Sequence, residues 1–420
     1  MGFLSRLNLK KSAINAIALV LVSAFYQKAF SSGYEFDGVG TAEVLRGGAV
    51  SADKGGWAHV YWNPAGIIGS QKSAGVEVRP GKMNVKDGNS IKVNGTDNNF
   101  SKKHQDSGFV LGSAGAVMPF GEKDALAFGV FTPLMNSVDF EDDKSLNPAY
   151  NKIDTKSFAG LVVVNISHSR KINEKISIGY GANILNGLLR GETKLGVNAV
   201  PPFIPAGYDF KGKMYGTGLG LEGVAGVKYD FNEKLSGAAV FRTGGTVKIE
   251  GDSKAYVNGV LSEKTDFTFK VKQPPTSTIG AVYRYDKTLK ISSDFSQTWW
   301  NGFSDKITLK TPGTFLKNQP KSFDWRTSIK FRLGFEKALS ETFSYMGGYA
   351  FDTPAIDKDS IDFSNAVDVP MHRFSAGIKK KLSSWDLSAG MLYGKGTRKE
   401  DSVKYALEGW FATFAADYRF

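Results

Sequence analysis

The last eleven residues of the chain alternate between two unlike faces. Successive side chains of a β-strand point to opposite sides, so residues two apart share a face. Counted back from the terminus, one face is apolar and has aromatic rings at both ends: Trp410, Ala412, Phe414, Ala416, Tyr418 and Phe420. An apolar strand face of this length with aromatic residues at both interfaces is typical of a strand that crosses a bilayer at a tilt. The same alternation recurs at 289–295, 345–351 and 385–393.

Tight polar turns alternate with longer irregular segments along the rest of the chain. The turns lie at 121–124, 173–175, 232–234, 286–287, 339–341 and 383–384, and the longer segments lie near 83–107, 133–156, 191–214, 251–264, 300–324, 352–370 and 396–403. Six turns and seven loops require fourteen strands. An even strand count, with short turns at one end and long loops at the other, is typical of outer-membrane barrels. The sequence therefore predicts an all-β fold, a 14-stranded antiparallel transmembrane β-barrel over residues 71–420. The alternative, a soluble β-sandwich, does not require an apolar outward face.

The first 32 residues have the composition of a secretory signal peptide. Arg6, Lys10 and Lys11 precede an apolar run over 13–25, which small residues follow. This order of basic, apolar and small residues directs export. The run is shorter than the roughly 20 apolar residues that a transmembrane helix needs. We expect residues 1–32 to be removed.

Residues 33–70 are rich in small residues and precede the first predicted strand. A barrel of fourteen strands encloses a lumen that wall side chains alone do not fill. This segment is therefore a candidate hatch inside the lumen. Composition alone leaves a loose periplasmic leader equally open.

The chain contains no pattern that indicates an enzyme, a metal site or a bound cofactor. It has no Cys, and its four His stand at positions 59, 104, 168 and 372, so no paired-His metal motif can be formed. Neither a GxSxG elbow nor a P-loop is present. The formal charge is +12, but the basic residues are spread over loops and turns. This distribution indicates attraction to anionic lipopolysaccharide and argues against nucleic acid as a partner.

Several short motifs, taken in order, resemble the FadL family of outer-membrane long-chain fatty-acid transporters and their aromatic-hydrocarbon relatives. The matching segments are Gly33-Tyr34, the stretch 47–53, Asn63-Pro64-Ala65, Pro274-Pro275-Thr276, Asp294-Phe295, Thr298-Trp299, the stretch 348–354, Pro370, Arg373 and the stretch 375–377. Trp300 stands where the family usually has serine. The resemblance covers essentially the whole mature chain. It implies that 33–70 is a hatch and that Asn63, Pro64 and Ala65 take part in its gating.

The third strand fits the family less well. Phe131-Thr132-Pro133 is followed by Leu134-Met135 in place of the family's Phe-Gly. The resemblance implies a kink here that opens the wall laterally, which makes Phe131 and Pro133 candidate gating residues. Proline has no N–H to donate to a ladder. From the residues alone we expect Pro133 to end its strand at the loop.

The segment 191–214 is unusually apolar for a loop that faces the outside. Its candidate ligand-binding residues are Val200, Phe203, Ile204, Tyr208 and Phe210. An exposed apolar patch usually marks a binding or membrane surface. The alternative is a lid packed on neighbouring loops, and the two readings do not exclude each other. In the family, outer loops form a hydrophobic landing groove at a similar place.

A fatty-acid carboxylate would need a cation along its route. Arg326, Lys330 and Arg332 share one face of the tenth strand, and Arg373 begins the twelfth. A guanidinium can hold a carboxylate through two hydrogen bonds. Arg326 and Arg373 are therefore candidate ligand-binding residues. The alternatives are that these cations pair with lumenal carboxylates or contact lipopolysaccharide phosphates at the rim.

The predicted function is passive uptake of hydrophobic molecules, such as long-chain fatty acids, across the Gram-negative outer membrane. The resemblance implies a route through the loop groove, a lumenal pocket, a shift of the hatch and a lateral exit. Alternatives are an aromatic-hydrocarbon channel of the same family, a general porin, and a surface adhesin or structural barrel. The expected partners are the hydrophobic substrate, outer-membrane lipid with lipopolysaccharide, and the barrel-assembly machinery, which would recognise Phe420. We expect a monomer.

Overall fold

The computed structural model describes residues 37–86, 91–93, 96–98, 104–142, 150–199, 206–301, 307–318, 324–357, 368–400 and 403–420. The expected signal peptide and residues 33–36 of the expected hatch lie outside these ranges. None of the helices in the described part is long and apolar enough to cross a bilayer.

Seventeen strand segments form one closed sheet. They are β1 (Ser73–Lys86), β4 (His104–Phe120), β5 (Asp124–Asp142), β6 (Tyr150–Lys171), β7 (Ile176–Val197), β8 (Tyr208–Asp230), β9 (Leu235–Arg242), β10 (Gly245–Val257), β11 (Val260–Gln273), β12 (Thr276–Arg284), β13 (Leu289–Thr298), β14 (Ile307–Leu309), β15 (Ser328–Ala338), β16 (Phe343–Asp352), β17 (Met371–Lys381), β18 (Trp385–Glu400) and β19 (Val403–Arg419). A separate two-stranded sheet consists of β2 (Ile91–Val93) and β3 (Thr96–Asn98).

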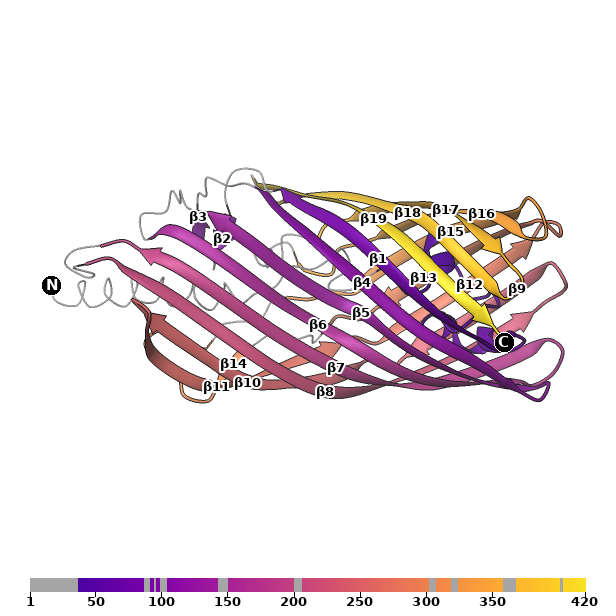
Figure 1. The fold of residues 1–420 in the computed structure, drawn as a ribbon, viewed down its shortest axis with the longest axis horizontal. Coiled ribbons are helices and arrows are strands. Elements are labelled where there is room, and N and C mark those ends of the chain that lie inside the picture. Colours follow the sequence, from indigo (N-terminus) through magenta and orange to yellow (C-terminus); the bar gives the residue numbers. More distant parts are fainter. Residues whose placement is uncertain are drawn as a thin grey trace.

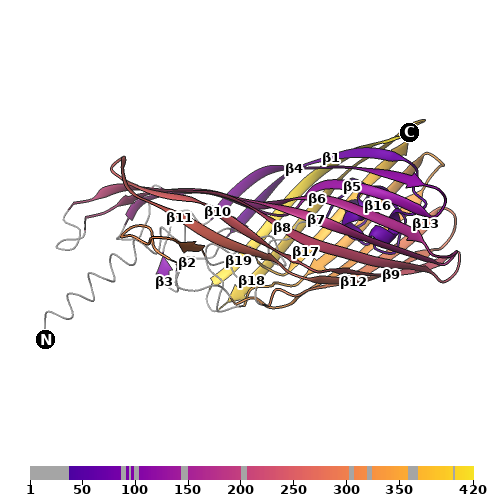
Figure 2. The ribbon, with the colours of Figure 1, turned by 90° about the horizontal axis from the view of Figure 1, so that it is seen from below.

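The sheet is an antiparallel barrel of fourteen crossings, as predicted (Figures 1 and 2). Three crossings are split in two, because β10 continues β9, β12 continues β11 and β14 continues β13. The break between β11 and β12 falls at Pro274 and Pro275, which have no amide hydrogen for a ladder. The last strand closes the barrel by pairing with the first, from Ser73 opposite Arg419 to Lys86 opposite Ala406.

The outward face of the wall is apolar, as the alternation predicts. On β19 the outward Trp410 and Phe414 are 46% and 48% exposed, whereas the inward Thr413 is buried. On β15 the outward Ile329, Phe331, Leu333 and Phe335 are all exposed, and the intervening residues are inward and mostly buried. The tight turns lie at the same end as the C-terminus (Figure 1). In outer-membrane barrels this end faces the periplasm.

Several expected loops are strand in the structure. Strands β5 to β8 extend well into 133–156 and 191–214, and β10 and β11 replace most of 251–264 (Figure 1). A tight turn joins β10 to β11 at Asn258 and Gly259, both of which have positive φ. On β7, β8 and β10 these extensions keep the period of two, but their outward residues are mostly charged, for example Glu192, Lys213 and Lys254. Without an apolar outward face they lack the lipid-facing signal from which the strands were predicted.

Pro133 does not end its strand, which corrects the expectation from the residues alone. Strand β5 continues to Asp142, and its register with β6 shifts between Phe131 and Leu134. Thr132 and Pro133 thus oppose a single residue, which is the definition of a β-bulge. A bulge leaves one residue without a ladder bond, so it suits a residue that cannot donate one.

The ladder between β4 and β5 stops near this bulge. It runs from Phe120, opposite Asp124, to Ala114, opposite Val130. Beyond that point β4 still pairs with β1 as far as His104, and β5 still pairs with β6 as far as Asp142. In the described part of the wall, the upper portions of β4 and β5, meaning those farther from the tight turns, are therefore unpaired with each other.

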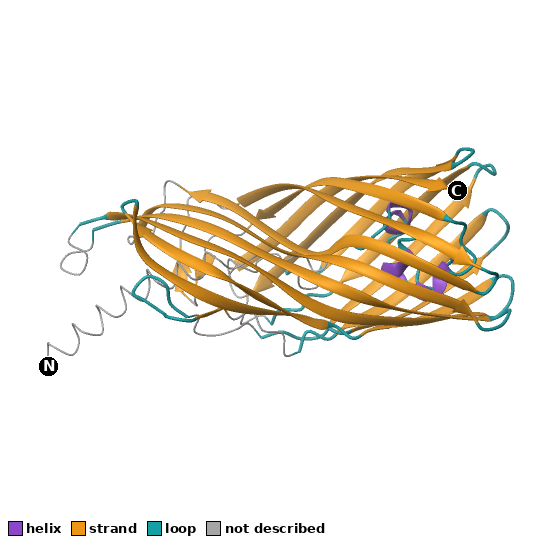
Figure 3. Ribbon diagram, turned by 60° about the horizontal axis from the view of Figure 1, so that its bottom comes forward, coloured by secondary structure: helices purple, strands orange, loops and turns teal. Residues whose placement is uncertain are grey.

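Residues 37–70, which we call the lumenal segment, lie inside the barrel near the tight-turn end (Figure 3). The segment contains α2 (Thr41–Leu45), α3 (His59–Trp62) and the 3₁₀ helix η1 (Pro64–Ile67). The helices are short, and contacts with the wall hold them. Ten wall glycines lie where an added Cβ would meet the segment within 3 Å: Gly75, Gly115, Gly129, Gly179, Gly226, Gly280, Gly334, Gly348, Gly377 and Gly390. We call this set the glycine belt.

Candidate functional site

Asp53 fastens the lumenal segment to the wall through a buried charge cluster. Its carboxylate contacts Arg46 of the same segment at 2.5 Å and Lys290 of β13 at 2.6 Å. Lys290 also contacts Glu336 of β15 at 2.9 Å. Burial alone would raise the pKa of the Asp53 carboxyl, but the ammonium of Lys290 and the guanidinium of Arg46 hold this pKa well below its usual value. Asp53 is therefore charged at neutral pH and anchors the segment.

A second anchor lies beside the first. The buried carboxylate of Asp294, on β13, accepts hydrogen bonds from the amides of Val50 and Ser51 and from the Ser51 hydroxyl. Both amides belong to a turn that has no regular secondary structure to satisfy them. A buried N–H needs a partner, so the wall carboxylate fixes the conformation of this turn.

Asn63, Pro64 and Ala65 form the turn that starts η1. The Asn63 side chain accepts a hydrogen bond from the Ala65 amide at 2.9 Å and donates one to the Ser51 carbonyl at 2.7 Å. Pro64 occupies the first turn of η1, where its missing N–H costs nothing. An added Cβ on Gly179 of β7 would lie 2.3 Å from the Ala65 amide. The predicted gating residues therefore lie where the segment meets the wall.

His59 is fully buried at the centre of the lumenal segment. Its ring lies between Gly55 and Gly66, and neither ring nitrogen has a hydrogen-bond partner among the described residues. Burial lowers the pKa of His59 to about 4, and it raises the pKa of Glu43, whose carboxylate lies 3.9 Å from the ring. Both shifts favour the neutral forms, so this contact is not an ion pair at neutral pH.

A small pocket of about 40 Å³ lies between the lumenal segment and strands β9, β12, β13 and β15. Its charged lining consists of Arg242, Lys330, Arg332 and Asp294, and Tyr61 and Trp62 of α3 contribute aromatic rings. The Arg242 guanidinium lies 4.7 Å from the centre of the Tyr61 ring, and that of Arg332 lies 5.7 Å from the centre of the Trp62 ring. The lining thus contains three cations and one carboxylate, and Arg242 also pairs with the buried Glu222 of β8 at 3.4 Å. We call this cavity the cationic pocket.

The cationic pocket contains two of the four cations that sequence reasoning considered. Lys330 and Arg332 share one face of β15, as predicted, and that face is the lumenal one. Arg373 instead contacts Asp37 at 2.7 Å and pairs with Asp352. Arg326 is half exposed and pairs with Asp357. Arg326 and Arg373 therefore make structural ion pairs away from the pocket.

Sequence reasoning missed other residues of the cationic pocket. Arg242 and Asp294 have the inward parity of β9 and β13, which was available from the sequence. The positions of Tyr61 and Trp62 could not be predicted in this way, because the lumenal segment is not a strand and has no period of two.

The apolar segment 191–214 lies only partly within the described residues. Val200, Phe203 and Ile204 lie outside the described residues. Tyr208 and Phe210, at the start of β8, contact Phe315 with ring centres 6.2 and 5.8 Å apart. The Glu263 carboxylate holds this contact in place, because it accepts hydrogen bonds from three consecutive amides at 314–316. Tyr208 and Phe210 are thus packed under a neighbouring loop.

Phe131 lies at the wall break, where its side chain points inward and is buried. Its ring meets Tyr61 edge to face, with centres 5.6 Å apart, and Tyr61 meets Trp62 at 4.8 Å. A line of three aromatic rings therefore joins the cationic pocket to the bulge at Pro133.

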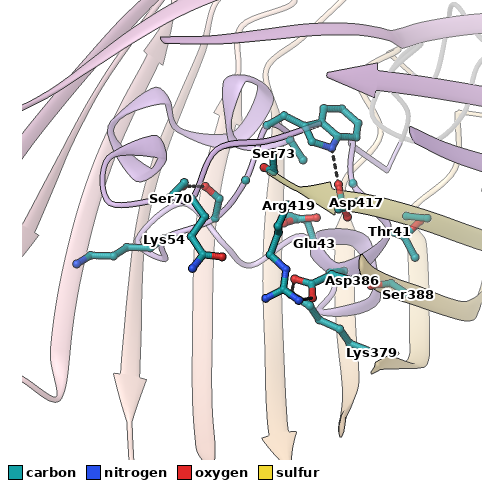
Figure 4. A pocket seen from close by; sticks show the side chains of 18 of the residues that line it. Thr41, Glu43, Lys54, Ser70, Ser73, Lys379, Asp386, Ser388, Asp417 and Arg419 are labelled. Carbon is teal, nitrogen blue, oxygen red and sulfur yellow. Dashed lines mark hydrogen bonds and ion pairs between the residues drawn. The ribbon is translucent and has the colours of Figure 1, made fainter. Parts of the chain in front are cut away.

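A larger chamber of about 270 Å³ lies on the other side of the lumenal segment, towards the tight turns (Figure 4). Acidic and basic side chains of the segment and of β17 to β19 line it: Glu43, Lys54, Lys379, Asp386, Asp417 and Arg419. Trp57 closes its inner side by donating a hydrogen bond to Asp417 at 2.8 Å. This polar lining suits water better than an apolar molecule. No cluster of His, Cys, Asp or Glu in the described part is arranged to hold a metal ion.

The chain is similar to known transport proteins. Residues 20–371 match the family described as "Outer membrane protein transport protein (OMPP1/FadL/TodX)". A FadL homologue of Pseudomonas aeruginosa has a TM-score of 0.74 at 14% identity, over 93% of this chain and 100% of that one. The toluene transporter TodX of P. putida has a TM-score of 0.68 at 14% identity, over 91% and 99%. The toluene transporter TbuX of Ralstonia pickettii has 0.64 at 16% identity, over 91% and 99%. Comparison with curated protein sequences finds no significant match.

Proposed function

Because this chain belongs to the OMPP1/FadL/TodX family of outer-membrane transport proteins, we propose that it takes up hydrophobic molecules that carry a carboxylate, such as long-chain fatty acids. Membership of this family means that the protein lies in the Gram-negative outer membrane and is a channel for hydrophobic compounds. The substrate class and the route are our proposal.

The cationic pocket is the observation that supports a substrate with a carboxylate. A neutral hydrocarbon gains nothing from buried cations, whose desolvation is costly. A carboxylate in the same place forms charge-assisted hydrogen bonds with a guanidinium or ammonium. Among the described residues, the Arg332 guanidinium donates one hydrogen bond, of 3.3 Å, to the Ser296 hydroxyl. Its ring contact with Trp62 leaves it beside an apolar surface that an acyl chain would contact.

An apolar lining supports the rest of the route. A single cluster of buried apolar side chains extends from Val60 of the lumenal segment, through Leu189 and Phe267, to Phe210 near the outer end. A substrate would enter between the outer loops, where Val200, Phe203 and Ile204 would form a landing surface. It would then move along this lining until its carboxylate reached the cationic pocket.

Release would require the aromatic contact between Tyr61 and Phe131 to open. The unpaired upper portions of β4 and β5 lie next to this contact and support a lateral exit into the bilayer. Movement of α3 and of Asn63, Pro64 and Ala65 would open the contact, while the anchors at Asp53 and Asp294 hold the rest of the lumenal segment. No energy source is required, because the substrate moves down its own gradient.

Uptake into liposomes that contain the refolded protein tests the proposal. Labelled oleate, labelled toluene and a small sugar would be compared for the wild type, Arg332→Met and Arg326→Met. We expect oleate uptake without sugar flux. Loss of charge-assisted hydrogen bonds at Arg332 should lower oleate uptake by about ten-fold. The Arg326→Met control removes a cation outside the pocket and should leave uptake unchanged.

Other outcomes contradict different parts of the proposal. Toluene uptake without oleate uptake would assign the protein to aromatic hydrocarbons. Sugar flux would indicate a porin, and no flux of any probe would favour an adhesin or structural barrel. Equal loss in both Met variants would remove the cationic pocket from the route.

A further inference from the structure

The outer surfaces of β6, β7 and β8 change abruptly from apolar to charged. In the lower part the outward residues are large and apolar, and each is 44% to 70% exposed: Val162, Val164, Ile166, Ile184, Leu219 and Leu221. Tyr215, which is 53% exposed, marks the upper limit of this band on β8. Above it, towards the outside, the outward residues of β8 are Lys213, Lys211 and Asp209.

The charged residues above the band are neighbours across three strands. Glu192 of β7 lies opposite Lys213 of β8, and Lys194 lies opposite Lys211. On the other side, Lys156 of β6 lies opposite Glu192. Arg190 is the next outward residue below Glu192 on β7. Because paired residues of adjacent strands point to the same face, these side chains form one surface. We call it the lysine patch.

Cations exceed carboxylates in the lysine patch. Glu192 is shared by three ammonium groups, at 3.5 Å from Lys194, 3.1 Å from Lys211 and 3.6 Å from Lys213. Lys194 also contacts Asp154 at 3.0 Å. Arg190 and Lys156 bring the cations of this surface to five. The carboxylates of the same face are Asp154, Glu192 and Asp209, and Asp139 of β5 stands opposite Lys156, so the excess is one positive charge. On the adjacent β10, Asp252 and Lys254 pair with each other at 2.7 Å and do not alter this excess.

We propose that the lysine patch binds the phosphate groups of lipopolysaccharide, with the acyl chains lying on the apolar band below it. Lys213 stands two residues beyond Tyr215 on the same face, which is about 7 Å along the strand. A ligand for this surface must therefore combine phosphate groups with several acyl chains a short distance below them. The phosphorylated lipid of the outer leaflet has this combination, whereas free phosphate lacks the apolar part. Clustered lysines next to a bilayer are also a general means of holding anionic lipid.

Glu192 has a defined place in this proposal. Without a ligand it keeps three mutually repelling ammonium groups together. When a phosphate arrives it competes for the same cations. Replacing Glu192 with Gln removes the competing charge but retains a hydrogen-bond acceptor, so it should strengthen lipid binding, an effect that a purely structural role does not predict.

The test measures binding of purified lipid A, with and without its phosphates, to the full barrel in nanodiscs by native mass spectrometry. We expect the wild type to bind the phosphorylated form at least ten-fold more tightly. The triple variant Lys194→Gln, Lys211→Gln, Lys213→Gln should lose this preference, and Glu192→Gln should increase it. The matched control removes three exposed lysines from the tight turns: Lys123→Gln, Lys175→Gln, Lys234→Gln.

The result is independent of transport. A heat-dependent shift in gel mobility would confirm that each variant is a folded barrel. Excess inorganic phosphate should not displace the lipid, and displacement would show a simple anion site instead. Full preference in the triple variant, no preference in the wild type, or equal loss in the control would each overturn the proposal.

Discussion

The carboxylate of Asp294, on the barrel wall, accepts hydrogen bonds from both the amide (3.0 Å) and the hydroxyl (2.9 Å) of Ser51 in the lumenal segment. The two residues are far apart in sequence and belong to different parts of the molecule. Their contact, together with that between Asp53 and Lys290, joins one side of the segment to β13. The opposite side, around Tyr61 and Val60, meets β5 through apolar contacts.

Asp294→Ala should release the turn that contains Ser51. The substitution leaves the buried amides of Val50 and Ser51 without partners, at a cost of about 1–3 kcal/mol for each. Hydrogen exchange over residues 47–54 should therefore increase, while exchange in the barrel strands stays the same. Ser51→Ala is the milder comparison, since it removes only the hydroxyl hydrogen bond and should cost about 1 kcal/mol. Unchanged exchange in Asp294→Ala would show that the anchor lies elsewhere.

Gly348→Ala should displace the lumenal segment from β16. The new Cβ would lie 2.0 Å from the backbone nitrogen of Gly47, and backbone cannot turn away as a flexible side chain can. Such overpacking typically costs about 1–3 kcal/mol. Protease sensitivity of the segment in folded barrels would detect the displacement. Gly112→Ala on β4 is the matched control, because its Cβ would come no nearer than 3.7 Å to a neighbour. Similar sensitivity in the two variants would contradict the role of the glycine belt.

Acid should loosen the lumenal segment through His59. Burial lowers its pKa from 6.5 to about 4, so a released segment binds a proton at a higher pH than a docked one. Docking is unaffected by this group above pH 6.5. It weakens by about 1.4 kcal/mol per pH unit as the pH falls from 6.5 towards 4, and changes no further below that.

The comparison with His59→Gln isolates this effect. Glu43 titrates in the opposite sense, because its raised pKa means that protonation favours the docked state, and it is present in both proteins. Hydrogen exchange of the segment, corrected for the intrinsic effect of pH, should rise more in the wild type than in the variant between pH 7 and 5. Parallel pH profiles would exclude His59 as the group responsible.

Deletion of Pro133 should close the break in the wall. Thr132 and Pro133 oppose one residue of β6, so removing one residue regularises the ladder and keeps the later register. We expect a folded barrel with reduced uptake of oleate, because pairing of β4 with β5 would close the proposed lateral exit. Proteoliposome uptake measures this directly. Thr132→Val, which keeps the bulge, serves as the control, and undiminished uptake after the deletion would count against a lateral exit here.

The barrel was accessible from the sequence because its two signals are local. Period-two alternation and tight turns depend only on near neighbours along the chain, and the resulting strand count of fourteen is confirmed. The ends of the strands were harder to predict. Beyond the bilayer the outward residues change from Leu219 to Lys213 on the same strand, so alternation continues without the apolar signal.

The candidate site was accessible only in part. Inward parity placed Lys330 and Arg332 in the lumen, but which carboxylate meets which cation depends on the stagger between distant strands. The partners of Arg373, Asp37 and Asp352, are an example. The bulge at Pro133 required knowledge of the pairing on both sides of β5, which a single strand does not contain.

The glycine belt makes the wall and the lumenal segment a matched pair. At ten positions the lumenal segment packs directly against the backbone of a wall glycine. A substitution that adds a side chain there would require a compensating substitution in the segment. A segment transplanted from a relative at 14% identity would meet a surface shaped for another insert. The two parts are therefore expected to diverge together, and the exchangeable unit among these barrels is the wall with its own insert.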